Sequence, residues 1–237
     1  MRKGVEKVAH TGRRYLFTGG GTGGHVTPNL ALIGEIRSRD RGAAILYLGS
    51  RNGYESRKLG EAGIPFAPIP CAQFTSPRRP LKFVRMLFAI VAGILKSAWH
   101  ILRFRPDVIV ATGGYVSVPP VLAAALLKRR IFLHEQNARP GAANRFLARF
   151  ATRIGMSFAR TLEDLPAPKG VHLGYPVRGR MAEGSADDAR RRYGIAPGMK
   201  VVFAVGGSMG SRSLNRGMVD ALPTLLKDSR IAVVLST

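Results

Sequence analysis

The sequence predicts an α/β protein built on a parallel β-sheet, and two observations carry this prediction. Short apolar strands alternate with helical segments along the chain, which is the pattern of consecutive βαβ units. Three glycine-rich turns, at residues 19–24, 113–114 and 206–210, each follow one of those strands. The chain of 237 residues is 46% hydrophobic, which is ample for one large domain or two small ones.

The first element is the strand Tyr15–Phe17, followed by five glycines within residues 19–24. Such a turn brings backbone N–H groups close to a ligand. It opens an apolar-periodic helix, in which Pro28 suits the first turn and Thr27 the N-cap. His25 lies at the mouth of that helix, where negative charge is favoured and a proton can be moved. We therefore expect a site for a phosphorylated or otherwise anionic ligand, the alternative being a tight turn and nothing more.

The spacing of residues 19–24 also satisfies G-x-G-x-x-G, the fingerprint of dinucleotide-binding folds, which is weak when it stands alone. Its usual companion is an acidic residue that closes the second strand and holds a ribose hydroxyl. The second strand here, Ala44–Leu48, runs into Gly49-Ser50-Arg51 and has no carboxylate there. The sequence therefore argues against NAD, while Arg51 leaves an NADP-dependent enzyme open.

The remaining elements of a first, Rossmann-like domain over residues 1–180 follow in order. Helices are expected at residues 54–62, 83–102, 121–128 and 142–151, and strands at 66–69, 107–111, 131–133, 154–156 and 171–173. Two polar motifs follow strands of this series, Gly113-Gly114-Tyr115-Val116-Ser117 and His134-Glu135-Gln136-Asn137.

A second domain is expected after a boundary near residues 179–186. Ser185 is predicted to cap a short helix that has acidic residues in its first turn, arginines in its last turn and Gly194 at its end. The strand Lys200–Val205, a glycine loop, a helix to about residue 226 and a strand at 231–235 then form one βαβ unit. Such a unit is too small to bury a stable core alone, so residues 181–237 are expected to be the incomplete start of a domain, or to need a partner.

The charge of the chain points to an anionic partner. Lys and Arg number 37 against 14 Asp and Glu, a net charge of +23, which suits nucleic acid or an anionic membrane surface; a general solubility effect is the alternative. No acidic residue lies between Ala62 and Pro106. That window holds the basic residues Arg78, Arg79, Lys82, Arg85, Lys96, Arg103 and Arg105.

The same window contains an apolar helix with the single tryptophan, Trp99. A basic, apolar helix without acidic residues indicates a membrane-surface element. One face of the helix is expected in the core, and the other face, with the loop Phe74–Lys82, on lipid. Nucleic-acid binding would need exposed aromatic residues interleaved with basic ones or a reading helix, and neither is found.

Three further features narrow the class of protein. The longest apolar run, Met86–Leu95, is too short to span a bilayer. Residues Met1–Arg14 are polar and basic and lack the apolar region of a signal peptide. The single cysteine, Cys71, excludes an internal disulfide and fits a reducing compartment.

Five separated motifs follow one another along the chain, at residues 20–28, 113–117, 134–137, 176–178 and 206–210. With this order and spacing, from about Arg14 onward, the chain resembles the MurG family. These are the UDP-N-acetylglucosamine:N-acetylmuramyl-(pentapeptide) pyrophosphoryl-undecaprenol N-acetylglucosamine transferases of bacterial peptidoglycan synthesis. The resemblance implies a GT-B fold of two Rossmann-like domains, with the lipid-linked acceptor on the N-terminal domain and most of UDP-GlcNAc on the C-terminal one. It also implies an inverting transfer to the muramyl 4-hydroxyl with no metal and no cofactor, by an enzyme peripheral to the cytoplasmic face of the bacterial inner membrane.

The resemblance implies roles for particular residues. The candidate catalytic residues are His25 and Glu135; the donor-binding candidates are Thr22, Gly23, Gly24, Asn137, Arg178 and Ser208; the acceptor-binding candidates are Tyr115 and Ser117. A guanidinium and the N–H groups of a glycine loop both suit a diphosphate leaving group. The structural alternatives are a helix-capping role for His25, a turn packed under the sheet for residues 113–117, and a buried hydrogen-bonded pair for His134 and Glu135.

The chain departs from the family's pattern in three places. Val118-Pro119-Pro120 stands where the family usually continues with a glycine, and Ala138-Arg139-Pro140 stiffens the loop after Asn137. The later part of the C-terminal domain, which holds the uracil, the ribose and a glutamate-bearing helix, has no counterpart. The 237-residue chain is therefore expected to bind UDP-GlcNAc poorly and to be inactive alone.

Two other classes stay open. One is a membrane-binding acceptor subunit of a split glycosyltransferase, although such a chain would be expected to end near residue 180. The other is the diacylglycerol galactosyltransferases, which share the architecture, while the motif His134-Glu135-Gln136-Asn137 favours the peptidoglycan enzyme.

Overall fold

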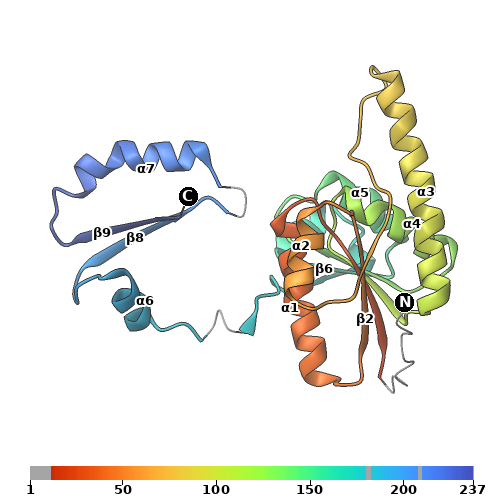
Figure 1. Ribbon diagram of the computed structural model, residues 1–237, viewed down its shortest axis with the longest axis horizontal. Coiled ribbons are helices and arrows are strands. Elements are labelled where there is room, and N and C mark those ends of the chain that lie inside the picture. Colours follow the sequence, from red (N-terminus) through yellow and green to blue (C-terminus); the bar gives the residue numbers. More distant parts are fainter. Residues whose placement is uncertain (1–11, 180–182, 208–209, 237) are drawn as a thin grey trace, which may run out of the picture. The chain divides into compact units, whose positions relative to one another are not determined.

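The computed structural model describes residues 12–179, 183–207 and 210–236. The chain forms two compact units, Met1–Val177 and Arg178–Thr237, and each is described here by itself (Figure 1).

The first unit is built on a seven-stranded sheet with the order β3-β2-β1-β4-β5-β6-β7, in which every pairing is parallel. The strands are β1 (Arg14–Thr18), β2 (Ala44–Gly49), β3 (Phe66–Pro68), β4 (Val108–Ala111), β5 (Ile131–Glu135), β6 (Arg153–Met156) and β7 (Gly170–His172). The helices are α1 (Gly23–Arg39), α2 (Tyr54–Glu61), α3 (Pro80–Phe104), α4 (Val118–Leu126) and α5 (Ala142–Leu147). The predicted α/β fold with a parallel sheet is therefore confirmed.

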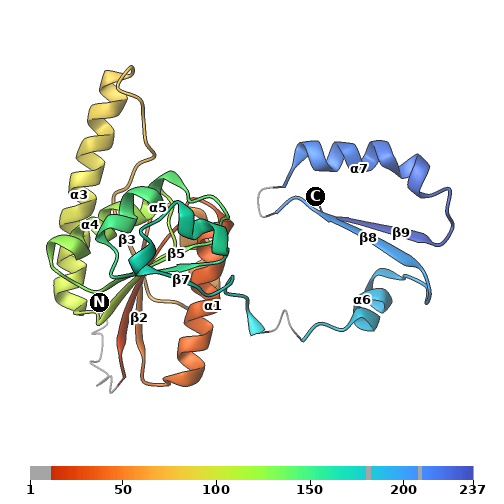
Figure 2. The same ribbon diagram turned by 180° about the vertical axis from the view of Figure 1, so that it is seen from behind.

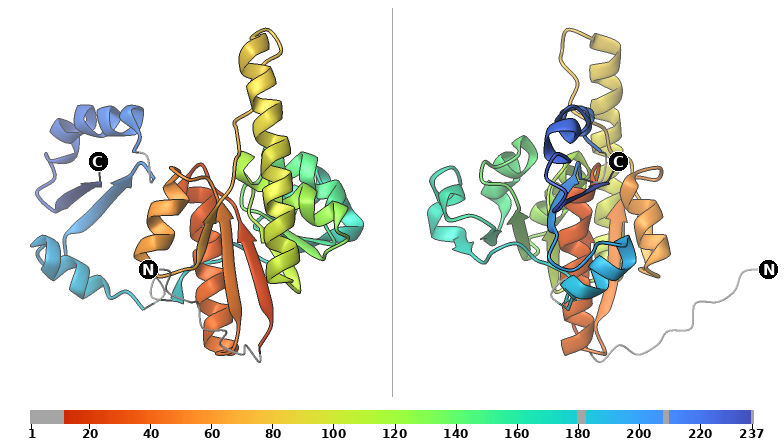
Figure 3. Two further views of the ribbon diagram at one scale, coloured as in Figure 1. Left: turned by 45° about the vertical axis from the view of Figure 1, so that its right-hand side comes forward. Right: turned by 90° about the vertical axis from the view of Figure 1, so that its left-hand side faces the viewer.

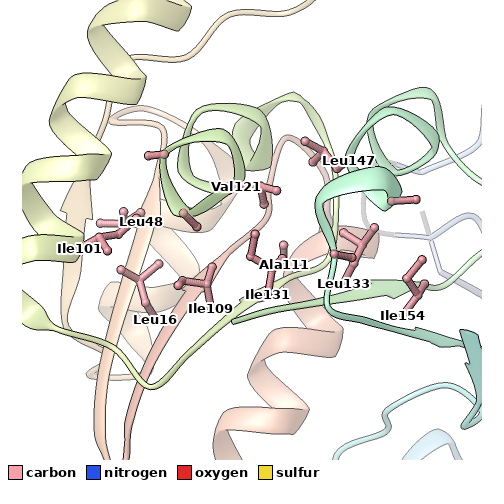
Figure 4. Packing of buried hydrophobic residues seen from close by; sticks show 14 of the residues in the cluster. Leu16, Leu48, Ile101, Ile109, Ala111, Val121, Ile131, Leu133, Leu147 and Ile154 are labelled. Carbon is pink, nitrogen blue, oxygen red and sulfur yellow. The ribbon is translucent and has the colours of Figure 1, made fainter. Parts of the chain in front are cut away.

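Alternating side chains of the strands fill two cores, one on each face of the sheet. Leu16 and Ile109 point to the larger core, where they meet Ile101 of α3, Val121 of α4 and Leu147 of α5 (Figure 4). The next residue along β1, Phe17, points to the opposite face and packs with Val110 of β4, Ile33 of α1 and Leu59 of α2. Figure 2 shows α3 and α4 on the opposite side of the sheet from α1. The sheet is thus covered by helices on both faces, as parallel sheets require.

The strand order reverses at β1, which pairs with β2 on one side and with β4 on the other. Ligands of doubly wound sheets bind outside the carboxyl ends of the strands at such a switch point. The first glycine loop follows β1 and the second follows β4, so the topology alone brings these two loops together.

Three helix starts differ from the prediction, and one of them is that of α3, which begins at Pro80 and not at residue 83. The N-cap of α1 is Thr22 and not Thr27, so α1 begins within the glycine loop and Pro28 lies inside the helix. The reason is that the chain turns at Gly19 and Gly21, both at positive φ, before it reaches Thr22. Likewise α4 begins at Val118, and its two prolines occupy the first turn, where their missing N–H groups would have no partner within the helix.

Helix α3 carries an exposed apolar stripe along its length. Met86, Gly93, Ser97 and Ile101 are its buried residues. The exposed apolar residues of α3 are Leu81, Val84, Leu87, Phe88, Val91, Leu95, Trp99 and Leu102, and Phe74 in the loop before it is also exposed. The N-terminal end of α3 projects past the rest of the first unit (Figure 3). Within the described residues, no helix has both the length and the apolar character needed to cross a bilayer.

The second unit contains α6 (Ala186–Tyr193) and a β-α-β segment made of β8 (Lys200–Val205), α7 (Arg212–Leu225) and β9 (Ile231–Ser236). The predicted cap of α6 is confirmed, because the Ser185 hydroxyl accepts a hydrogen bond from the backbone N–H of Asp188, and Gly194 ends the helix at φ 64°. Strands β8 and β9 are parallel neighbours. Ala204 is the one buried hydrophobic residue among the described residues of this unit, whereas Val201, Phe203 and Val205 on the other face of β8 are exposed.

Candidate active site

The two glycine loops touch at the switch point. The backbone N–H of Gly20 donates to the carbonyl oxygen of Gly113 at 3.4 Å. Gly114 has φ +77°, and a Cβ at this position would lie 2.2 Å from the carbonyl oxygen of Gly20. Only glycine permits this approach, because a side chain would both strain the backbone and push the loops apart.

A buried polar network lies beneath the loops, and no sequence motif pointed to it. The side-chain amide of Asn29 donates to the hydroxyls of Tyr47 and Thr112, at 3.0 and 2.9 Å. Tyr47 in turn donates to the carbonyl oxygen of Gly19 at 2.6 Å, and Thr112 donates to the carbonyl oxygen of His25. Burial raises the pKa of Tyr47 far above its ordinary value, so its hydroxyl stays protonated and can act as this donor. The network holds the glycine loop and the start of α1 to strands β2 and β4.

The N-terminus of α1 is open. Thr22 makes no side-chain cap, because its hydroxyl bonds Nδ1 of His25 at 2.9 Å. The backbone N–H groups of Gly23 and Gly24 belong to the first turn and have no partner within the helix. Free N–H groups and the helix dipole together make a site for an anion.

His25 stands beside this open helix end and close to the second glycine loop. Burial lowers the pKa of His25, and the negative charges of Glu135 and Glu55 act in the opposite direction. A lowered pKa keeps the imidazole neutral at pH 7. When Nδ1 donates to the Thr22 hydroxyl, Nε2 carries the lone pair that a general base needs.

Glu135 is fully buried at the end of β5, and four hydrogen bonds engage its carboxylate. One oxygen accepts from the backbone N–H and the side-chain amide of Asn137, at 2.8 and 3.1 Å. The other accepts from the backbone N–H of Gly141 at 3.0 Å and from the side-chain amide of Asn144 at 2.8 Å. This geometry uses the carboxylate to hold the loop after β5. Its partners are Asn137, Gly141 and Asn144 and not His134, whose ring lies 3.4 Å from the carbonyl oxygen of Gly174.

The other predicted site residues of the first unit differ in exposure. Asn137 is exposed in the loop that Glu135 holds. The ring of Tyr115 lies against Gly21, where a Cβ would be 2.9 Å from it. Burial, and then the nearby Cys71 and Glu55, raise the pKa of Tyr115. Ser117 is fully buried and its hydroxyl donates to the carbonyl oxygen of Gly113 at 2.8 Å, so it supports the second loop from below.

Two predicted donor-binding residues, Arg178 and Ser208, lie outside the described part of the first unit. Arg178 is exposed and is the first residue of the second unit. Ser208 lies outside the described residues. Across the described ranges, no group of three or more His, Cys, Asp or Glu side chains is arranged to hold a metal ion.

Sequence reasoning missed Glu55. This carboxylate is fully buried in the first turn of α2 and accepts a hydrogen bond from the backbone N–H of Gly21 at 3.1 Å. The sequence has no acidic residue at the end of β2, but in the structure the carboxylate of Glu55, from the helix that follows, lies at that strand end. An acidic residue in a first helical turn is ordinary, so its burial could not have been inferred.

This first unit is a doubly wound domain that presents paired glycine loops, an open helix N-terminus and a histidine at its switch point, an arrangement whose chemistry suits a phosphorylated ligand. The chain belongs to glycosyltransferase family 28: the model of the glycosyltransferase family 28 N-terminal domain matches residues 15–156.

Its relatives include UDP-N-acetylglucosamine--N-acetylmuramyl-(pentapeptide) pyrophosphoryl-undecaprenol N-acetylglucosamine transferases. The chain is 39% identical to transferase 1 of Bacillus cereus over 209 residues, which are 88% of this chain and 57% of that protein. It is 37% identical to the transferase of Halalkalibacterium halodurans over 215 residues, 91% of this chain and 58% of that protein. The resemblance to the MurG family is thus confirmed, and the chain spans a little over half the length of these relatives.

Solved structures support the GT-B fold. MurG of Acinetobacter baumannii superposes with a TM-score of 0.67 at 24% identity, covering 95% of this chain and 66% of that one. HepE of Anabaena, in complex with UDP-glucose, superposes with a TM-score of 0.60 at 14% identity, covering 95% of this chain and 70% of that one. The family model and the relatives at 37–39% identity, and not these structures, favour a glycosyltransferase over an NADP-dependent enzyme.

Proposed function

We propose that this protein transfers N-acetylglucosamine from UDP-GlcNAc to the 4-hydroxyl of the undecaprenyl-pyrophosphoryl-linked muramyl-pentapeptide, a step of peptidoglycan synthesis. The observation that carries the proposal is the 39% identity over 88% of the chain to transferases named for this reaction. The paired glycine loops and His25 support it, because they supply an anion site and a proton acceptor at one switch point.

In the proposed reaction, His25 accepts the proton of the muramyl 4-hydroxyl as its oxygen attacks the anomeric carbon of GlcNAc. The new C–O bond forms on the face opposite the bond to UDP, which breaks, so the configuration inverts and UDP leaves with the electron pair. The leaving diphosphate gains negative charge, which the N–H groups of Gly23 and Gly24 at the helix end and the Thr22 segment are placed to stabilise. No metal or cofactor enters this scheme.

In this proposal the first unit binds the acceptor and also contacts the donor, and the second unit begins the part that binds most of UDP-GlcNAc. Residues 1–180 bind the lipid-linked acceptor, with Tyr115 at the second loop facing it and Ser117 holding that loop from below. Residues 181–237 begin the part that binds UDP-GlcNAc, with Arg178, Asn137 and Ser208 assigned to the donor. Glu135 acts by positioning Asn137, through the two hydrogen bonds that join them.

The acceptor carries an undecaprenyl chain, and the exposed stripe of α3 is suited to its membrane. Phe88 is 72% exposed, Leu81 72% and Leu95 67%, while basic residues and no acidic ones lie in the same segment. Apolar side chains can enter the headgroup boundary, while lysines and arginines contact anionic lipids. We place the protein at the cytoplasmic face of the bacterial inner membrane, with no role for nucleic acid.

Vesicle sedimentation tests this assignment. The purified chain is mixed, at physiological salt, with anionic vesicles that either contain or lack the muramyl-pentapeptide pyrophosphoryl lipid at matched surface charge. We expect the lipid to increase binding beyond the charge-matched vesicles. Binding that follows surface charge alone would contradict acceptor recognition by this chain. A parallel assay for GlcNAc transfer asks whether the additional length of the relatives is required, and turnover by the 237-residue chain would show that it is not.

A further inference from the structure

Glu55 is a buried charge with a defined set of partners. Its side chain is inaccessible to solvent, and its carboxylate accepts hydrogen bonds from three donors. These are the backbone N–H of Gly21 at 3.1 Å, the backbone N–H of Ser50 at 2.9 Å, and the Ser50 hydroxyl. The carboxylate therefore joins the first glycine loop to the end of β2.

Three glycines, one in the first glycine loop and two between the end of β2 and the start of α2, make room for this carboxylate. A Cβ on Gly20 would lie 2.5 Å from the carboxyl carbon of Glu55, and a Cβ on Gly53 would lie 2.4 Å from one of its oxygens. A Cβ on Gly49 would lie 2.8 Å from its Cγ. Any side chain at these positions would displace the carboxylate or be displaced by it. Gly20 of the first loop is thus needed to leave space for the Glu55 side chain, and not for a ligand.

The negative charge of Glu55 is unfavourable for binding of the anionic ligand proposed for the first glycine loop. Burying a carboxylate costs free energy that only its hydrogen bonds offset. Its charge also repels an anion at the N-terminus of α1. A benefit to the reaction must therefore come from geometry. By holding the N–H of Gly21 inward, at φ +88°, Glu55 turns the chain so that the N–H groups of Gly23 and Gly24 are left for the ligand.

We propose that Glu55 is a positioning residue of the glycosyl transfer, whose carboxylate holds the first glycine loop in its anion-binding conformation. The inference rests on the proposed function, because it assumes that the loop binds the diphosphate of a substrate. Glu55 touches no substrate and acts through Gly21.

The test compares Glu55→Gln with Glu61→Gln in the 237-residue chain, with inorganic pyrophosphate as the probe. Glu61 is a matched control, since it lies on the same helix and is exposed in an ion pair with Lys58. The glutamine at position 55 keeps the size of the side chain, but it has one acceptor oxygen in place of two and cannot accept from the N–H groups of both Gly21 and Ser50. We expect Glu55→Gln to weaken pyrophosphate binding about tenfold by calorimetry, the equivalent of one lost charge-assisted hydrogen bond, and Glu61→Gln to leave it unchanged.

The sign of the effect distinguishes positioning from simple electrostatics. Removal of a negative charge near an anion site should tighten binding, so equal or tighter binding by Glu55→Gln would overturn the proposal. If the wild-type chain binds no pyrophosphate, the anion site of the proposed function fails as well. If only the variant comparison fails, the proposed function stands without this role for Glu55.

A second measurement needs no variant and covers the case in which Glu55→Gln does not fold. Amide hydrogen exchange in the wild-type chain is expected to be slower at Gly21 than at Gly23 and Gly24, and pyrophosphate is expected to add protection at Gly23 and Gly24 only. If Gly21 exchanges as fast as those two glycines, or if pyrophosphate protects it to the same degree, the inward-facing N–H is not there and the proposal is wrong.

Discussion

Replacement of Gly114 by alanine tests the contact between the two glycine loops. Gly114 has φ 77° and ψ 163°, a backbone conformation that costs a residue with a side chain about 1–3 kcal/mol. The added Cβ would lie 2.2 Å from the carbonyl oxygen of Gly20, so the loops must separate. Separation breaks the hydrogen bond from Gly20 to Gly113, worth about 1 kcal/mol. We expect Gly114→Ala to lower the free energy of unfolding of the first unit by about 2–4 kcal/mol.

Replacement of a second glycine, Gly34, is expected to change the free energy of unfolding in the opposite direction. Gly34 lies in the interior of α1, and an added Cβ there meets no atom within 4 Å. Gly34→Ala is therefore expected to stabilise the first unit by about 0.5–1 kcal/mol, because alanine loses less conformational entropy in a helix. Urea unfolding followed by the fluorescence of Trp99, the single tryptophan, reports on this unit.

The same two variants bear on ligand binding. Gly114→Ala is expected to weaken pyrophosphate binding, because the loops no longer meet, whereas Gly34→Ala is expected to leave it unchanged. A Gly114→Ala protein within 1 kcal/mol of the wild type that binds pyrophosphate equally well would refute the view that the loops depend on each other.

Three further outcomes are expected. Burial lowers the pKa of His25 and of His134 in the folded state, so the unfolded chain takes up protons first as the pH falls below about 6.5. The urea midpoint of the first unit should therefore be constant at higher pH and decrease from pH 7 to pH 5.5, and His134→Asn should reduce that decrease. Phe88→Ser should lower binding to anionic vesicles roughly ten- to hundredfold with no change in the urea midpoint, since an exposed phenylalanine contributes about 1.5–3 kcal/mol only when lipid covers it. Ser185→Ala removes the hydrogen bond to the N–H of Asp188 and should destabilise α6 by about 1 kcal/mol, measured as faster amide exchange in its first turn.

The sheet and its helices could be predicted because each depends on local pattern. Short apolar runs bounded by glycine and proline predict strands such as β4, and the long apolar segment without acidic residues predicts α3. The start of α1 was predicted wrongly, at Thr27, because Pro28 is a strong start signal and the structure tolerates it inside the helix. Helix boundaries depend on how a preceding loop turns, which the residue pattern does not specify.

The site was predictable only in part, for a related reason. Glycine loops and a nearby histidine are visible as motifs, whereas the contacts that shape them join distant residues. The bond between Gly21 and Glu55 spans 34 positions, and that between Asn29 and Thr112 spans 83. Glu135 was visible in its motif, but only its hydrogen bonds indicate that it holds a loop.

The continuity of the first unit has a consequence for synthesis on the ribosome. All seven strands of its sheet, and the stripe of α3, lie within Met1–Val177, and the strands of the later described residues, β8 and β9, form a sheet of their own. Nascent domains fold as units, N-terminal first, and translation proceeds at about 5–20 residues per second. The segment from Arg178 to Thr237 therefore takes roughly 3–12 s more to synthesise. Under the proposed membrane role, the surface that contacts lipid is therefore complete in the chain before the segment from Arg178 onward is synthesised.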